Sequence, residues 1–333
     1  MDMTEASSAV QQGPQGRLSL LVRQIRFEAV GINSYELVDP AGADLPPFTA
    51  GAHLDVHLPN GVIRQYSLCN CPSERHRYVI AVLRDAQGRG GSTALHQSLR
   101  VQDMATVSHP RNNFSLGTQA GKVILLAGGI GVTPLKSMAH ALDAAGVPFE
   151  LHYCARNAES VAFATELAGP WKHGKPTFHF DHGNPAAGLD IAGLLRTVEP
   201  GAHLFYCGPP GFMQACANAA AHWPAGAVHC EHFKAPDMAR LASDAVPGSF
   251  TVKIASSGQR IDIAPGVSIA DALNAAGVRV ETSCQSGLCG TCKVRYLEGE
   301  VDHQDMILDD GEHQQWLTAC VSRATSALLV LEL

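Results

Sequence analysis

The sequence predicts a multidomain protein that joins an antiparallel β-barrel, an α/β domain with a parallel sheet, and a smaller α+β domain. Three observations support this fold class. The 333 residues are enough for two or three domains. Short β-like runs fill the first part of the chain, and longer apolar runs that alternate with helical patterns begin near Lys122. Four of the ten cysteines lie close together in the sequence, between Cys284 and Cys320.

The barrel is expected over residues 17–116, after a disordered tail at 1–16. Its strands are short and are separated by Gly, Pro and Asn, a pattern typical of an antiparallel barrel. The runs that predict strands are Leu18–Ile25, His53–Leu58, Gly61–Leu68, Tyr78–Leu83 and Ala105–Ser108.

The α/β domain is expected over residues 117–233. Continuous apolar strands at Val123–Ala127 and Phe149–Ala155 each precede a helical pattern, at 135–146 and 160–169, and two more strands follow at 176–181 and from His203. This alternation predicts a parallel sheet whose ligand site lies at the carboxyl ends of the strands.

The α+β domain is expected over residues 249–333, after a linker at 234–248. Two strands precede a helix for which Ser268 is the expected N-cap, and a cysteine-rich loop follows. Residues 249–333 hold 6 Lys and Arg against 11 Asp and Glu, a net charge of 6 − 11 = −5. Seven of these acids lie between Glu298 and Glu312, which predicts either a solvated surface or a docking face.

Composition excludes several classes of protein. Apolar residues make up 46% of the chain and charged residues 17%, so wholesale disorder is excluded. The net charge of −7 argues against binding to nucleic acid or to an anionic membrane surface. No apolar run reaches the roughly 18 residues of a membrane span. The first residues carry no signal-peptide pattern, so a cytoplasmic protein with reduced thiols is expected.

The most specific motif is Cys284-x4-Cys289-x2-Cys292, followed by Cys320. Four thiolates with this spacing predict a plant-type [2Fe–2S] cluster. Gly287 and Gly290 lie inside the loop, where the backbone must curl around the cluster. The alternative, a zinc site, more often shows two C-x2-C pairs.

Three further motifs predict phosphate binding. Gly128–Pro134, GGIGVTP, lies between a predicted strand and a predicted helix, as a phosphate-binding loop does, although a plain strand–helix turn is an alternative. Arg64-Gln65-Tyr66-Ser67-Leu68 offers a guanidinium, an aromatic ring and a hydroxyl, and Gly88–Ser92 offers a second anion nest. A half-buried strand with an exposed arginine would explain the Arg64–Leu68 motif equally well.

The other cysteines and the histidines predict no site. Cys154, Cys216 and Cys230 are expected in the core, and Cys69-x-Cys71 lacks partners for a four-ligand site. The 16 histidines show no metal-binding helix motif and are expected on the surface or in the core.

Seven motifs in this order resemble the phthalate dioxygenase reductase family, including the vanillate O-demethylase reductases. The resemblance covers nearly the whole chain after residue 16. It is carried by Arg64-x-Tyr66-Ser67-Leu68, GRGGS (Gly88–Ser92), PRNNF (Pro110–Phe114), GGIGVTP, CGPPGFM (Cys207–Met213), Glu231-x-Phe233 and the C-terminal cysteine motif.

The resemblance implies an FMN-binding barrel, an NAD-binding domain and a β-grasp ferredoxin domain. Carried over by position, Arg64 with Gly90, Gly91 and Ser92 should hold the FMN phosphate, and Tyr66 and Ser67 should lie at the isoalloxazine. The residues expected at the dinucleotide are Gly128, Gly129, Gly131 and Thr133, with Cys207 and Gly208 near the nicotinamide. Ser67, Cys207 and Phe233 are the expected catalytic residues, and Cys284, Cys289, Cys292 and Cys320 are the expected iron ligands.

The implied function is electron transfer from NADH through FMN and a [2Fe–2S] cluster to a Rieske-type oxygenase that acts on an aromatic acid or a similar small molecule. NADH delivers two electrons together whereas a [2Fe–2S] cluster accepts one, so a flavin between them has a clear purpose. Two alternatives stay open: a reductase for another acceptor, such as a cytochrome P450 or free flavin, and a non-enzymatic redox carrier or sensor. Arg156, where an acid would be expected to bind the ribose, leaves the choice between NADH and NADPH open as well.

Overall fold

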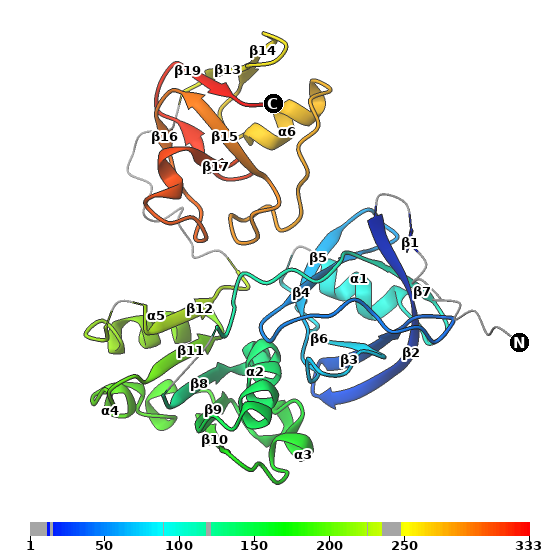
Figure 1. Ribbon diagram of the computed structural model, residues 1–333, viewed down its shortest axis with the longest axis vertical. Helices are drawn as coiled ribbons and strands as arrows, with labels where there is room; N and C mark the ends of the chain where they lie inside the picture. Colours follow the sequence, from blue (N-terminus) through cyan, green and yellow to red (C-terminus); the bar gives the residue numbers. More distant parts are fainter. Residues whose placement is uncertain (1–11, 14–15, 89, 118–120, 225, 235–247) are drawn as a thin grey trace, which may run out of the picture. The chain divides into compact units, whose positions relative to one another are not determined.

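The protein divides into two compact units, one ending at Phe233 and the other beginning at Lys234. A computed structural model describes residues 12–13, 16–88, 90–117, 121–224, 226–234 and 248–333 (Figure 1). The predicted tail at 1–16 and the predicted linker at 234–248 lie almost entirely outside these residues.

The first sheet of the first unit is antiparallel and has the strand order β5-β4-β7-β2-β3-β6, with β1 paired to β2. An isolated antiparallel bridge between Leu68 and Ile80 joins the two ends of this order, as in a barrel. A helix, α1 (Gly91–Ser98), follows β6. The strands are β1 (Gln12–Gly13), β2 (Arg17–Ala29), β3 (Ile32–Val38), β4 (His53–His57), β5 (Ile63–Ser67), β6 (Tyr78–Leu83) and β7 (Met104–Val107).

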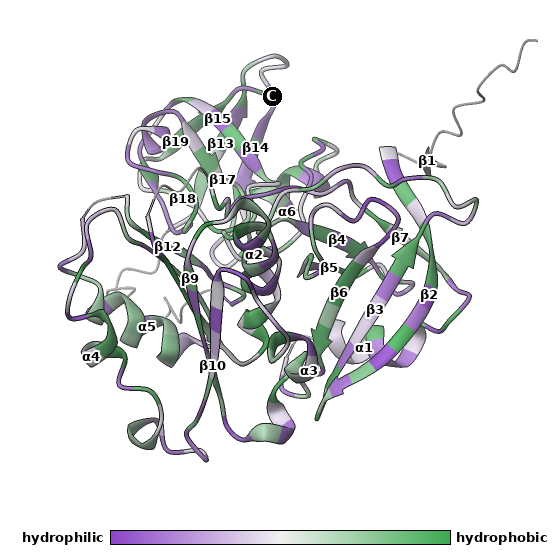
Figure 2. Ribbon diagram, turned by 60° about the horizontal axis from the view of Figure 1, so that its bottom comes forward, coloured by the Kyte–Doolittle hydropathy of each residue, from purple (hydrophilic) through white to green (hydrophobic). Residues whose placement is uncertain are grey.

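The residue pattern along the chain predicts most of the strands of this sheet. In β2, buried and less buried residues alternate along the first half of the strand. Figure 2 shows both hydrophobic and hydrophilic stretches along its ribbon. Strand β3 was not predicted, because polar residues interrupt its apolar pattern. They are nevertheless buried: Ser34 donates to Glu28 at 2.7 Å, and Arg77 pairs with Glu36 at 2.7 Å.

The second sheet of this unit is wholly parallel, with the order β10-β9-β8-β11-β12. The first strand of this sheet along the chain, β8, lies in its middle. Strands β9 and β10 follow on one side of β8, and β11 and β12 follow on the other side. The order therefore reverses between β8 and β11, which is the usual ligand crevice of such sheets. The strands are β8 (Val123–Gly128), β9 (Phe149–Ala155), β10 (Gly174–Phe180), β11 (His203–Cys207) and β12 (Val228–Glu231).

The helices beside this sheet differ from the sequence prediction in two places. The first, α2 (Val132–Ala145), begins three residues before the predicted 135, directly after the 3-10 turn η2 (Gly129–Gly131). The helix predicted at 160–169 is reduced to α3 (Ala164–Leu167), because Phe163 before it adopts a left-handed φ of +59°. Two more helices are α4 (Ile191–Leu195) and α5 (Pro210–Ala219).

One hydrophobic cluster includes residues from both sheets and so joins the barrel to the parallel sheet. Phe114, from the PRNNF motif, lies in this cluster with its ring centroid 5.8 Å from that of Phe205 on β11. Lys136 on α2 is buried and donates to the carbonyl oxygen of Cys69 at 2.9 Å, while its ammonium pairs with Glu166 at 2.7 Å. Phe114 of the PRNNF motif is therefore a core residue of this junction.

The second unit is a mixed sheet with one helix against it. Its strand order is β14-β13-β19-β15-β17, in which only β13 and β19 are parallel. Ser268 is confirmed as the N-cap of α6 (Ile269–Ala275), since its Oγ accepts the backbone N–H of Asp271 at 3.0 Å. The strands are β13 (Phe250–Ile254), β14 (Arg260–Ile263), β15 (Lys293–Glu298), β16 (Val301–Asp302), β17 (Trp316–Thr318), β18 (Arg323–Ala324) and β19 (Leu328–Leu331).

This arrangement of a mixed sheet and a packed helix is the β-grasp expected for the α+β domain. Among the described residues, no helix combines the length and the apolar composition that crossing a membrane requires.

Candidate functional site

Three polar side chains from separate strands meet where the barrel joins the parallel sheet. Ser67 ends β5, Cys207 ends β11 and Glu231 ends β12. Cys207 and Glu231 are paired residues of adjacent parallel strands, so their side chains lie on the same face of the sheet. The hydroxyl of Ser67 donates to Oε2 of Glu231 at 3.4 Å. The carboxyl edge of the parallel sheet is therefore in contact with the barrel.

Burial controls the ionisation of this group. It raises the pKa of the Glu231 carboxyl to about 8, although the hydrogen bond from Ser67 lowers the pKa in part. It also raises the pKa of the Cys207 thiol well above its ordinary value, and the nearby Glu231 raises that pKa further. Cys207 is therefore a neutral thiol at pH 7, and Glu231 is a carboxyl that can hold a proton there.

The glycine loop at the same edge is shaped by backbone contacts. A Cβ on Gly131 would lie 2.1 Å from the carbonyl oxygen of Cys207, and one on Gly208 would lie 3.0 Å from the Cα of Gly128. These glycines allow the turn after β8 to pack directly against the end of β11. Gly129 is different, because a Cβ there meets nothing within 4 Å and its φ is +54°. Of these glycines, Gly129 thus borders open space, and the others serve close packing.

Thr133, which was predicted to face the dinucleotide, is only 2% exposed. Its hydroxyl donates to the carbonyl oxygen of Ile130 at 3.0 Å and so closes the turn before α2. A contact from this side chain to a bound dinucleotide stays a prediction.

A second cradle lies where β5 meets the beginning of α1. Gly91 packs so closely against Arg64 that a Cβ would lie 2.4 Å from Nε of the guanidinium. The preceding Gly90 has a φ of +80° and is the N-cap of α1, and no side chain supplies a cap hydrogen bond there among the described residues. Ser92 Oγ accepts the backbone N–H of Asp85 at 3.0 Å. A guanidinium beside a helix N-terminus suits a phosphate, so these residues fit the group that was predicted for them.

The two aromatic residues of the prediction lie in different surroundings. Tyr66 is partly buried against the barrel core, and burial raises the pKa of its hydroxyl. Phe233, just after β12, is 40% exposed. The ring of Phe233 is thus available to stack on a flat ligand.

The four predicted iron ligands come together in the second unit. Hydrogen bonds link the thiol of Cys284 to those of Cys289 and Cys320. A further hydrogen bond between Cys292 and Cys320 lowers the pKa of the Cys292 thiol. The backbone N–H of Leu288 donates to the sulfur of Cys284 at 3.4 Å.

The loop that carries these thiols curls as its glycines predict. Gly287 and Gly290 have φ values of +69° and +71°, in the left-handed region that favours glycine. Three thiols on a loop that directs an N–H at sulfur, joined by the thiol of Cys320 from the turn after β17, fit an iron–sulfur cluster.

The expectation for the other cysteines is correct for Cys216 and wrong for Cys230. Cys216 is buried, Cys154 is partly buried, and Cys230 is exposed on β12. Strand β12 lies at the edge of the parallel sheet, and among the described residues no strand pairs with its outer side.

Sequence reasoning gave no role to Glu231, which the structure places at the centre of the site. It appears in the sequence only as part of the Glu231-x-Phe233 motif, and its hydrogen-bond partner in the barrel, Ser67, is 164 positions away in the chain. The available signal was its place at the end of a strand beside the strand of Cys207.

Comparisons with known proteins agree with this geometry. A family model for the 2Fe-2S iron-sulfur cluster binding domain matches residues 252–325. The chain is 53% identical over 327 residues to the tert-butanol monooxygenase / tert-amyl alcohol desaturase reductase subunit of Aquincola tertiaricarbonis, with 96% of this chain and 97% of the relative covered. It is 44% identical over 319 residues to the phthalate dioxygenase reductase of Burkholderia cepacia, with 96% and 98% covered.

Two solved structures extend the comparison. A phthalate dioxygenase reductase, described as a modular structure for electron transfer from pyridine nucleotides to [2Fe–2S], matches with a TM-score of 0.73 at 44% identity, covering 96% of this chain and 98% of that one. An intact type IV self-sufficient cytochrome P450 monooxygenase matches with a TM-score of 0.83 at 34% identity, covering 96% of this chain and 41% of that one. With its barrel, parallel sheet and cluster-binding domain in the same order, the chain belongs to the phthalate dioxygenase reductase family of oxygenase reductases.

Proposed function

We propose that this protein passes electrons from NADH through FMN to a [2Fe–2S] cluster and then to a separate terminal oxygenase of the Rieske type. The observation that carries the proposal is the convergence of four thiols, three from the 284–292 loop and Cys320 from the turn after β17, in a chain whose other unit has a parallel sheet with a strand-order reversal between β8 and β11. When bound, FMN would accept two electrons together from NADH and pass them on one at a time to the cluster.

In this proposal the barrel holds the flavin. The guanidinium of Arg64 and the N-terminus of α1 at Gly90 and Gly91 bind its phosphate, supported by their mutual close packing. Tyr66 packs against the flavin ring, and the hydroxyl of Ser67 hydrogen-bonds its edge. Ser67 is buried, so water has little access to its hydroxyl.

The parallel sheet brings the nicotinamide to the same place. The backbone of the glycine loop binds the dinucleotide at Gly129, where no side chain intrudes. Cys207 and Gly208 would flank the nicotinamide, and the exposed ring of Phe233 would lie near the flavin ring. Glu231 holds a proton beside Ser67 because its pKa is raised to about 8. Hydride transfer needs alignment above all, and these residues supply it.

The partner is the least constrained part of the proposal. Relatives at 53% and 44% identity are named for oxygenases of different substrates, tert-butanol in one and phthalate in the other. An aromatic acid is therefore one candidate substrate class and a tertiary alcohol is another. We place the docking face on the acidic stretch between Glu298 and Glu312, which would meet a basic patch on the partner.

A cytochrome P450 is the second candidate acceptor. It is favoured by the match between this whole chain and 41% of a self-sufficient P450 monooxygenase. In that protein the matching segment and the P450 belong to one chain, whereas here the electron acceptor would be a separate protein.

An anaerobic titration with NADH, followed by visible absorbance, tests the internal pathway. Bleaching of both the flavin and the iron–sulfur bands is expected. Bleaching of the flavin alone would contradict transfer to the cluster. In side-by-side rate assays, kcat/KM should be several-fold higher for NADH than for NADPH. A preference for NADPH would overturn the choice of NADH.

The acceptor is tested by adding the reduced protein to a purified Rieske oxygenase and, in parallel, to a P450. Faster reduction of the Rieske centre is expected, with a rate that falls as salt is raised. A salt-independent rate would contradict electrostatic docking, and faster reduction of the P450 would favour the second candidate.

A further inference from the structure

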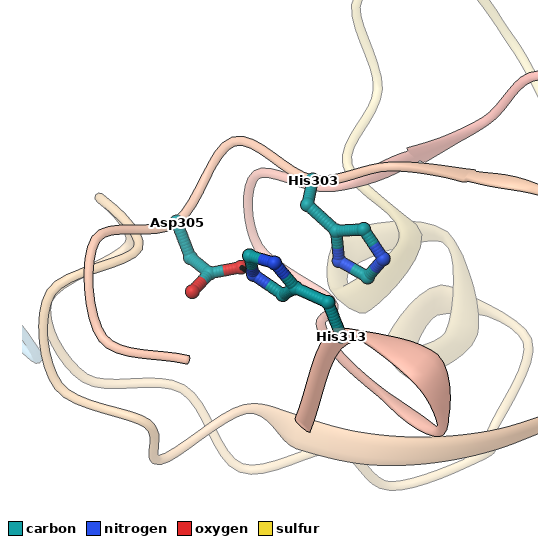
Figure 3. A group of neighbouring side chains, drawn as sticks. All are labelled: His303, Asp305 and His313. Carbon is teal, nitrogen blue, oxygen red and sulfur yellow. Dashed lines mark hydrogen bonds and ion pairs between the residues drawn. The ribbon is translucent and has the colours of Figure 1, made fainter. Parts of the chain in front are cut away.

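Two histidines and an aspartate in the second unit gather beside the cluster-binding loop without belonging to it. His303 and Asp305 follow β16, and His313 lies in the 3-10 turn η6 (Glu312–Gln314). One ligand atom from each residue lies within 4.8 Å of the other two. Figure 3 shows the ring of His313 between the Asp305 carboxylate and the ring of His303. We call these three residues the His–Asp–His cluster.

The carboxylate of this cluster is fixed in place. The side chain of Asp305 has no solvent exposure. One carboxylate oxygen, Oδ1, accepts the backbone N–H groups of Ile307 and Leu308 at 3.2 and 2.9 Å. The other oxygen, Oδ2, is thereby directed at Nε2 of His313, 3.3 Å away. A tetrahedral ion with bonds of about 2.0–2.1 Å separates its ligand atoms by about 3.4 Å, so this pair already has ligand spacing.

The third side chain has an unsatisfied nitrogen. The ring of His303 stacks on that of His313 with centroids 4.0 Å apart and planes at 23°. Its Nδ1 is shielded from solvent and has no hydrogen-bond partner within the described part of the chain. A shielded donor or acceptor left in this way costs about 1–3 kcal/mol. A metal ion bound by the cluster would use this nitrogen.

The donor set restricts the kind of ion. Two imidazoles and one carboxylate suit Zn²⁺ and neighbouring divalent transition metals, with water in the fourth position. They do not suit Ca²⁺ or Mg²⁺, which take six or more oxygen ligands. The set contains no thiolate, so it is distinct from the four cysteines of the iron–sulfur loop.

The cluster is mechanically linked to that loop. Met306 donates its backbone N–H to the carbonyl oxygen of Gly287 at 3.1 Å, and a Cβ on Gly287 would lie 3.0 Å from the Cα of Asp305. Gly287 lies between two of the iron ligands. On the other side, Tyr296 of β15 donates to the carbonyl oxygen of His313 at 2.7 Å.

We propose that His303, Asp305 and His313 bind one divalent transition-metal ion, Zn²⁺ by preference, and that this ion fastens the 303–313 segment against the iron–sulfur loop. The site is separate from the electron pathway and does not rest on it. Binding is a ligation step without electron transfer: Nε2 of His313 releases to solvent the proton that it shares with Asp305, and each imidazole then gives a lone pair while the carboxylate gives charge.

Equilibrium dialysis of the full-length holoprotein against micromolar Zn²⁺ tests this inference, with zinc and iron measured together by mass spectrometry. We expect one zinc for every two irons in the wild type. The single variants His303→Gln and His313→Gln should each weaken zinc binding by about 100-fold or more, since even outer-shell substitutions cost 10–100-fold. Unchanged iron content shows that the variants fold and that zinc has not replaced iron.

The matched control is His152→Gln, which alters another stacked pair, His152 and His179, whose ring nitrogens are 3.0 Å apart. This control should bind zinc as the wild type does. Wild-type protein without zinc at this concentration would overturn the proposal. So would zinc binding that survives in both His303→Gln and His313→Gln, or that is lost in the control alone. Because the measurement is metal content, it is independent of NADH oxidation and of the acceptor.

Discussion

The substitution Gly131→Ala tests how the glycine loop and the end of β11 cooperate. A Cβ at position 131 would lie 2.1 Å from the carbonyl oxygen of Cys207 and 2.7 Å from the nitrogen of Gly208. Ordinary contact begins at 3.4 Å, so the turn and the strand end must separate by about 3.4 − 2.1 = 1.3 Å. Both neighbours are backbone atoms, which cannot rotate away as a side chain would.

The expected magnitude follows from this displacement. A misplacement of about 1 Å lowers the rate of a positioned reaction by about 100-fold, which corresponds to about 2.7 kcal/mol of barrier. We therefore expect kcat/KM for NADH to fall by about 100-fold. Overpacking of this kind also costs about 1–3 kcal/mol of stability, so a lower Tm is expected as well.

The assay is anaerobic stopped-flow reduction of the flavin by NADH, with flavin and iron content measured in the same sample. The matched control is Gly201→Ala in the turn before β11, at the opposite end of that strand, where a Cβ meets nothing within 4 Å and the φ of +76° adds only conformational strain. That strain is about 1–2 kcal/mol and displaces no neighbouring strand. We expect the control to retain NADH kinetics within about tenfold of the wild type.

The reasoning is refuted if the two variants, with equal flavin content, show equal kinetics. Such a result would mean that the contact between the turn and β11 does not position the nicotinamide.

Three further changes have defined outcomes. Cys289→Ser should lose the cluster iron and still transfer electrons from NADH to flavin, as iron analysis and flavin bleaching will show. Arg64→Ala should lower the flavin retained on purification, because a phosphate loses its guanidinium. Glu231→Gln should change how stability depends on pH: the folded-state pKa of about 8 lies above the ordinary 4.5, so the wild type loses stability as pH rises from 4.5 through 8. The Tm of the variant relative to wild type should therefore be higher at pH 9 than at pH 5.

Each of these predictions has a control or a contradicting result. Cys71→Ser, outside the cluster-binding unit, should keep full iron content, and iron retained in Cys289→Ser would contradict the ligand assignment. Arg26→Ala, with a side chain 62% exposed, should keep its flavin, and full flavin occupancy in Arg64→Ala would argue against a phosphate role. A Tm difference for Glu231→Gln that is constant with pH would contradict the raised pKa.

Two secondary-structure predictions failed, one for strand β3 and one for the helix at 160–169. Strand β3 was missed because its buried polar residues, such as Glu36, are stabilised by arginines from elsewhere in the barrel, Arg23 on β2 and Arg77 just before β6. The helix predicted at 160–169 followed an apolar pattern, but much of that segment packs into the core in an irregular conformation, with Phe163 at a left-handed φ. In both cases tertiary contacts outweighed the local pattern.

The sequence by itself determined the features that depend on short chain separations. Cysteine spacing identified the four thiols that converge, and the apolar runs identified the parallel strands, because both are local properties of the chain. The fold class and the family resemblance followed from the order of such local motifs.

Only the tertiary structure decided which distant residues meet. Ser67 and Glu231 are brought to 3.4 Å across 164 positions, and the burial that raises the Glu231 pKa exists only once the barrel packs on the parallel sheet. The histidines show the same limit, since no sequence spacing marks His303 and His313 as neighbours until β16 and η6 fold over the iron–sulfur loop. Contacts of this kind depend on long-range packing, which residue patterns along the chain do not encode one by one.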